Sequence, residues 1–143
     1  MLRFFPLLLL PVLIYNLIVF GDGAVLHHDI QDLLGYNHAI TITMFSGDQW
    51  KFSFGDVLVL MTLLLLFVEV IKATRTSSRE IINHGLSMLI FVVALVEFIV
   101  VKGFASTPFF FIVAMTLFDV VAGYTISIVA AEHDLGLGKA GSD

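Results

Sequence analysis

The chain has 143 residues, of which 59% are apolar and only 13% are charged, and its mean hydropathy is +1.02. Soluble domains are about 45–50% apolar and about 25% charged, so this composition excludes a water-soluble domain and indicates the lipid bilayer as the main surroundings. The absence of cysteine excludes a disulfide framework, a thiolate metal site and a cysteine nucleophile. A formal net charge of −5 argues against nucleic acid as a partner.

Long apolar stretches predict a single all-α integral membrane domain over residues 1–143, built as a four-transmembrane-helix bundle. A helix needs about 20 residues to cross a bilayer core of about 30 Å. The predicted spans are residues 4–20, 54–73, 81–101 and 108–131. The first is short and contains Pro6 and Pro11; Pro6 falls in its first turn, whereas Pro11 should kink it. Because Gly21-Asp22-Gly23-Ala24 is a poor cleavage site, we expect this segment to remain as a span rather than a cleaved signal peptide.

Charged residues in the loops predict the orientation. The short link between the second and third spans carries Lys72, Arg75 and Arg79, whereas the long link, residues 21–53, is mainly acidic. The positive-inside rule then places the short link in the cytoplasm and the long link outside. The predicted location is a bacterial inner (plasma) membrane, with both termini in the cytoplasm. The cytoplasmic tail covers residues 132–143, and we expect it to be disordered from Gly136 onward.

The long extracytoplasmic first loop has its own pattern. Leu26, Ile30, Leu33 and Leu34 fall at helical spacing before Gly35, which predicts a short amphipathic helix. Residues 39–45 and 50–54 alternate around a turn at 46–48, which predicts a β-hairpin. Its aromatic residues would lie at headgroup level and form an outer interaction surface; they are Trp50, Phe52 and Phe54.

Asp119 is the deepest ionisable residue and lies near the middle of the fourth span. A stripe of small residues follows it at intervals of four, which favours close contact with another helix; the stripe is Asp119, Gly123, Ser127 and Ala131. One interpretation is that Asp119 binds a proton or a cation. The favoured one is a protonated carboxyl that hydrogen-bonds across a helix contact, for example to Thr62 or Asn16.

Two further acids lie within spans. Glu97 occupies the outer half of the third span, where it and Asp119 can define a polar track through the outer half of the bundle. Glu69 is three residues from Lys72 near the cytoplasmic end of the second span, and this spacing predicts an ordinary ion pair on one helix face.

The histidines raise cofactor and metal hypotheses. His84 and His133 are the candidate axial ligands for a haem, but a lone intramembrane histidine beside Asn83 is more typical of hydrogen-bonded packing, so we expect no cofactor. A divalent metal on the outer surface has four candidate ligands: His27, His28, Asp29 and His38. Adjacent residues on a helix point to different faces, so a solvated loop is favoured and we expect no metal.

Sequence motifs for catalysis are missing: the chain contains no Walker A motif, no Gly-x-Ser-x-Gly and no His-Glu-x-x-His. The leading hypothesis is a non-catalytic accessory or scaffolding subunit of a larger membrane complex. It would bind a membrane-protein partner, or a second copy of itself, through the outer hairpin and the small-residue stripe. The alternative is an oligomeric proton- or cation-coupled carrier or channel that uses Asp119 and Glu97. A cofactor-binding electron-transfer subunit is the third hypothesis.

Overall fold

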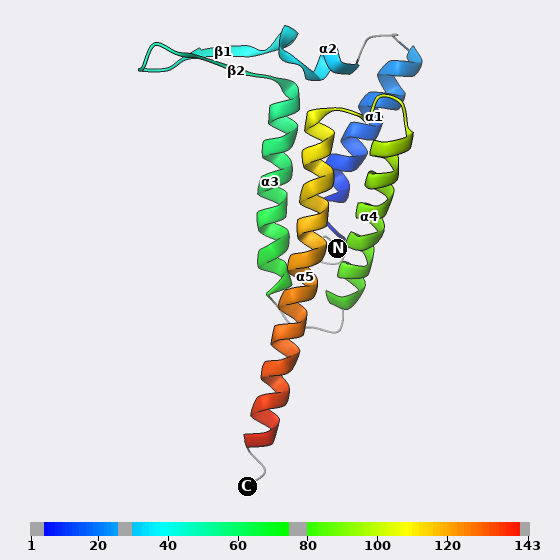
Figure 1. The fold of residues 1–143 in the computed structure, drawn as a ribbon, viewed down its shortest axis with the longest axis vertical. Helices are drawn as coiled ribbons and strands as arrows, with labels where there is room; N and C mark the ends of the chain where they lie inside the picture. The colour runs from blue at the N-terminus through cyan, green and yellow to red at the C-terminus, as the bar shows by residue number, and fades with distance from the viewer. Residues whose placement is uncertain (1–4, 26–29, 75–79, 141–143) are drawn as a thin grey trace.

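The computed structural model describes residues 5–25, 30–74 and 80–140, and this part of the chain is mostly helical. The elements in chain order are α1 (Leu9–Val25), α2 (Ile30–Leu34), η2 (Tyr36–His38), β1 (Ile40–Thr43), β2 (Gln49–Phe52), α3 (Phe54–Ala73), α4 (Glu80–Val100) and α5 (Thr107–Ala140). Helices α3, α4 and α5 stand side by side with α1 against their upper half, while α2 and the two strands lie across one end (Figure 1). We call this end the hairpin end. The opposite end, where α3 ends and α4 begins, is called the far end.

Three helices are long and apolar enough to cross a membrane: Phe54–Ala73, Ile82–Val100 and Thr107–Val129. They correspond to the second, third and fourth predicted spans. The first predicted span, 4–20, differs: α1 starts only at Leu9, and its apolar part, Leu9–Gly21, is shorter than the other three helices.

The late start of α1 changes the role of its prolines. Pro11 falls in the first turn of the helix, where its missing N–H costs no intrahelical hydrogen bond. The prediction that Pro11 kinks the first span is therefore wrong, because Pro11 lies in the first turn of α1 and not in its interior. Pro6 precedes the helix, and its carbonyl accepts the N–H of Leu9 at 3.1 Å.

Helix α5 does not end at residue 131 but continues to Ala140. Its 34 residues correspond to about 51 Å at 1.5 Å per residue, well beyond the roughly 30 Å of a hydrocarbon core. Figure 1 shows it extending far past the ends of α3 and α4. The tail that was expected to be disordered from Gly136 is thus helical as far as Ala140, and no proline interrupts this stretch.

An aromatic cluster joins α1 to the other helices at the hairpin end. Tyr15, Phe104 and Phe109 are all buried, and their ring centroids lie 4.4–5.3 Å apart. The Tyr15 hydroxyl donates to the carbonyl of Gly103 at 3.2 Å and lies 2.6 Å from the Ser106 hydroxyl. Ser106 also accepts the N–H of Phe109 at 3.2 Å, so the same hydroxyl caps the start of α5. We call Tyr15, Phe104 and Phe109 the aromatic latch.

The β-hairpin predicted from the alternating residues is confirmed. β1 and β2 are antiparallel, with Ile40 opposite Phe52 and Ile42 opposite Trp50. This register places the four apolar residues on one face, and Thr41, Thr43, Gln49 and Lys51 on the other. In the connecting turn, Gly47 has φ +91°, a left-handed conformation that glycine adopts without strain.

A capping box fixes how the hairpin meets the bundle. The Ser53 hydroxyl accepts the N–H of Asp56 at 3.2 Å, and the Asp56 carboxylate accepts the N–H of Ser53 at 2.8 Å. Because Ser53 directly follows β2, the hairpin turns into α3 within a single residue. It therefore projects sideways across the end of the bundle and past α3 (Figure 1).

Replacing Tyr15 by Phe should weaken the latch while keeping its ring packing. The variant loses the hydroxyl that contacts Gly103 and Ser106, so we expect the free energy of unfolding to fall by about 1 kcal/mol. Thermal unfolding in detergent measures this change. The matched control is Tyr124→Phe, at a more exposed tyrosine of α5, which should unfold like the wild type; equal loss in both variants would contradict the assignment.

Candidate functional site

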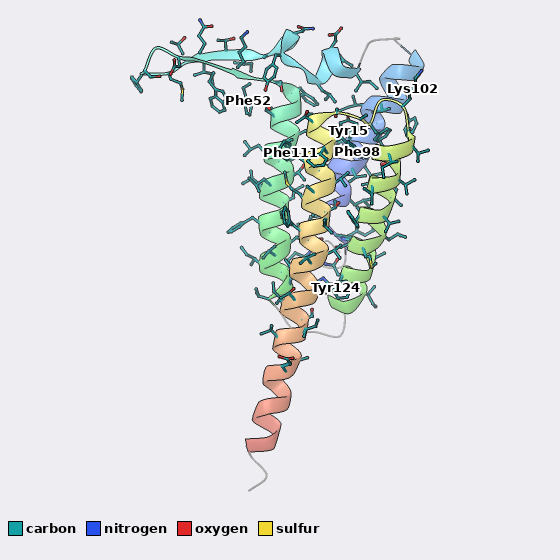
Figure 2. The ribbon with its side chains drawn as sticks, in the orientation of Figure 1. Tyr15, Phe52, Phe98, Lys102, Phe111 and Tyr124 are labelled. Atoms are coloured by element: carbon teal, nitrogen blue, oxygen red, sulfur yellow. The ribbon has the colours of Figure 1, made fainter. Side chains whose placement is uncertain are left out.

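Five polar side chains are buried together where α3 and α4 pack along α5. They are 2–4% exposed and come from three helices: Glu69, Asn83, His84, Ser87 and Asp119. We call them the polar cluster. Figure 2 locates its level by Tyr124, whose ring lies 5.9 Å from that of His84, toward the far end of the bundle.

Glu69 is the best-satisfied member of the polar cluster. Its two carboxylate oxygens lie 2.9 and 3.1 Å from Lys72 Nζ, which is the ion pair expected from their spacing. It also accepts Asn83 Nδ2 at 2.8 Å and the backbone N–H of Leu7 at 3.3 Å. The carboxylate therefore connects α3 to α4 and to the segment before α1 through charge-assisted hydrogen bonds.

Asp119, on α5, is the second buried acid of the polar cluster and faces Ser87 of α4. The Ser87 hydroxyl lies beside its carboxyl without meeting the geometry of a hydrogen bond, and His84, Glu69 and Lys72 are the surrounding charged or titratable groups. The partners considered from the sequence are engaged elsewhere. Thr62 donates to the Leu58 carbonyl at 2.6 Å, and Asn16 donates to the Val12 carbonyl and to Glu97.

Four buried polar atoms of the cluster have no hydrogen-bond partner among the described residues. They are Asn83 Oδ1, His84 Nε2, Ser87 Oγ and Asp119 Oδ2. Folded proteins rarely leave such atoms unpaired, since each costs about 1–3 kcal/mol when desolvated. Together they form a polar layer between α4 and its neighbours that is able to donate and accept hydrogen bonds.

The small-residue stripe makes its first contacts within the chain. A Cβ built on Gly123 would lie 2.6 Å from His84 Cε1, so the absence of a side chain at Gly123 is what lets the imidazole pack against α5. Asp119 is likewise covered by α4. Ser127 is half-buried and Ala131 is exposed, so only this later part of the stripe is open to another molecule.

Glu97 lies at a different depth from Asp119. It is ten residues beyond Ser87 on α4, or about 15 Å along the helix axis. Its carboxylate accepts Asn16 Nδ2 at 3.0 Å and thereby joins α4 to α1. The polar track proposed from the sequence is therefore divided: Glu97 contacts α1, whereas Asp119 lies in the polar cluster.

The histidine hypotheses are only partly within the described structure. His27, His28 and Asp29 lie outside the described residues, as do the side chains of His38 and His133. Across residues 5–25, 30–74 and 80–140, no group of three or more His, Asp or Glu side chains is arranged to hold a metal ion. His84 contributes its imidazole to packing against Gly123.

The hairpin aromatics form a second, separate surface. Trp50 and Phe52 contact each other at 5.2 Å between ring centroids, while Phe54 is the exposed first residue of α3. Figure 2 shows Phe52 on the underside of the hairpin, next to α3. A groove of about 350 Å³ lies between the two elements and is lined by Tyr36, Trp50, Lys51, Phe52, Asp56, Val59, Leu60 and Leu63.

Ser87 is a site residue that the sequence did not predict, and Asn83 was expected only as a neighbour of His84. Their spacing of four residues, which puts both on one face of the third span, is the signal that can find them. Their relation to Glu69 and Asp119 has no local signature, because it depends on how α4 lies against α3 and α5.

Replacing Gly123 by Ala tests the packing of His84. The added methyl group would overlap the imidazole, so we expect a loss of about 1–3 kcal/mol in the free energy of unfolding. Gly85→Ala is the matched control: it is also a helical glycine, with no atom within 4 Å of its added Cβ, and it should be neutral or slightly stabilising. Thermal unfolding of the two variants measures the difference. Similar stabilities of Gly123→Ala and Gly85→Ala would show that His84 does not pack against Gly123.

Comparisons with known proteins identify no relative. No protein-family model matches the chain, and neither characterised proteins nor solved structures give a significant match.

Proposed function

We propose that this protein is a non-catalytic, four-span subunit of the bacterial inner membrane that acts by binding another integral membrane protein. The observation that carries the proposal is the groove between the underside of the hairpin and the outward face of α3. The occupant we propose is a transmembrane helix of the partner, standing beside α3 with its outer end under the hairpin.

Exposure of the hairpin supports this proposal. Most of its apolar face stays exposed: Ile40 is 68% exposed and Trp50 is 50% exposed. A two-stranded hairpin is marginally stable alone, so a surface that covers this face would also stabilise it. Aromatic side chains such as Trp50 and Tyr36 are enriched at the centres of protein interfaces.

The outward face of α3 continues the same surface. Below the hairpin, α3 exposes a run of large apolar side chains: Leu60, Leu63, Leu64 and Phe67. Helices associate in lipid through van der Waals packing rather than through a hydrophobic driving force, so shape matters more than apolarity. The corner between α3 and the hairpin offers a rigid helix two surfaces at once.

Two features support the proposed four-span topology. The segment that carries α1 contacts both ends of the bundle: the N–H of Leu7 donates to Glu69 near the far end, and the Tyr15 hydroxyl donates to the Gly103 carbonyl near the hairpin end. The basic residues Lys72, Arg75 and Arg79 favour a cytoplasmic far end. We therefore place the hairpin outside and both termini in the cytoplasm.

Site-specific photo-crosslinking tests the association. A photoreactive amino acid at Trp50 or at Leu63, the two sides of the groove, should give the same discrete protein adduct in native membranes. Thr41, on the polar face of the hairpin, and Ile99, on the exposed face of α4, are the control positions and should give none. Lipid adducts alone at all four positions would overturn the proposal.

Substitutions distinguish binding through the groove from nonspecific hydrophobic association of exposed aromatic residues. Trp50→Ser should reduce recovery of the crosslinked partner from Leu63 several-fold, because Trp50 lines the groove. Phe45→Ser is the matched control, since Phe45 is a fully exposed aromatic residue at the hairpin tip and does not line the groove. Equal recovery in both variants would contradict the assigned surface.

Cysteine labelling tests the topology, because the natural chain has no cysteine. In intact bacterial cells, a membrane-impermeant maleimide should label Ser46→Cys in the hairpin turn. It should label Thr74→Cys, at the end of α3, only after the membrane is permeabilised. The reverse pattern would invert the orientation, and labelling of both from one side would show that α3 does not cross the membrane.

A further inference from the structure

We propose that Asp119, Ser87 and His84 form a proton-binding centre between α4 and α5, with the proton held on the carboxyl of Asp119. This site goes beyond the proposed association function, which uses the outer groove. Its three residues are at most 3% exposed, and each contributes one buried atom without a hydrogen-bond partner.

Charge distinguishes Asp119 from the other buried acid. Glu69 already has the ammonium of Lys72 against both of its oxygens and two further N–H donors. Asp119 has no such partner among the described residues. An ionised Asp119 would therefore be a buried charge without a paired cation, and binding a proton removes that charge.

The groups that face Asp119 are suited to both of its protonation states. When a proton from water binds Oδ2, the resulting O–H can donate to the Ser87 hydroxyl oxygen. When the proton leaves to water, the Ser87 hydroxyl can turn and donate to the carboxylate. The other titratable or charged groups nearby are Glu69 and Lys72 from α3 and Tyr124 from α5.

The chemistry of the site favours a proton over a larger ligand. Packing of the His84 imidazole against Gly123 leaves no side-chain-sized space at that contact. A proton needs none, because it occupies an existing hydrogen-bond position. Lys72, in the last turn of α3 with a partly exposed side chain, places the cluster within about one helical turn of the far end.

Infrared spectroscopy of the full-length protein in lipid nanodiscs tests this centre. Spectra recorded from neutral to alkaline pH, where ordinary Asp and Glu side chains are already ionised, should contain the carbonyl stretch of a protonated carboxyl that disappears with a defined midpoint. Asp119→Asn should lose that band. Glu97→Gln is the matched control, an intramembrane acid bonded to Asn16, and should keep it. An unchanged band in Asp119→Asn, or its loss in Glu97→Gln, would overturn the proposal.

A second variant keeps the test valid if Asp119→Asn fails to fold, as judged by circular dichroism and gel filtration. Ser87→Ala keeps the carboxyl and removes only the hydroxyl beside it. Loss of the hydroxyl proposed to bond both protonation states should move the midpoint of the band by about one pH unit, a tenfold change in proton affinity. A midpoint equal to that of the wild type would show that Ser87 is not part of the centre and would overturn the proposal.

Discussion

The carboxylate of Glu69 is the interaction on which the far end of the bundle depends. A charge inside an apolar bundle is stable only when donors surround it, and Glu69 obtains them from Lys72, Asn83 and the backbone of Leu7. These donors come from α3 itself, from α4 and from the segment before α1. Satisfying one charge therefore fixes three segments that are distant in sequence. The bond from Asn83 to Glu69 also requires that one face of α4 be turned toward α3 at this level.

At the hairpin end, hydrogen bonds at the turns likewise hold segments that are distant in sequence against one another. Tyr15 connects α1 to the turn before α5, and Ser106 both contacts Tyr15 and caps α5. The Ser53–Asp56 capping box turns the hairpin into α3 without a linker. The hairpin is consequently held across the end of the bundle, and its apolar face lies over the outward side of α3. This is the geometry from which the proposed association surface arises.

The outer groove and the polar cluster use different parts of the molecule. The groove lies on the outward side of α3 and beneath the hairpin, whereas Asp119, Ser87 and His84 are enclosed between α4 and α5. The two proposals can therefore succeed or fail independently. The small-residue stripe belongs to the side of the polar cluster: Gly123 serves the internal contact with His84, and Ala131 stays exposed beyond it.

Apolar runs in the sequence determined the three long helices, because any stretch of about 20 apolar residues satisfies its backbone hydrogen bonds only as a helix when surrounded by lipid. Alternating side chains around Gly47 determined the hairpin in the same local way. The start of α1 and the continuation of α5 to Ala140 were not determined, because helix ends depend on weak local preferences. Only the tertiary structure decided which groups surround Asp119 and which side chain bonds Glu97. Periodicity places a residue on a helix face, but which helix it meets depends on packing over the whole chain.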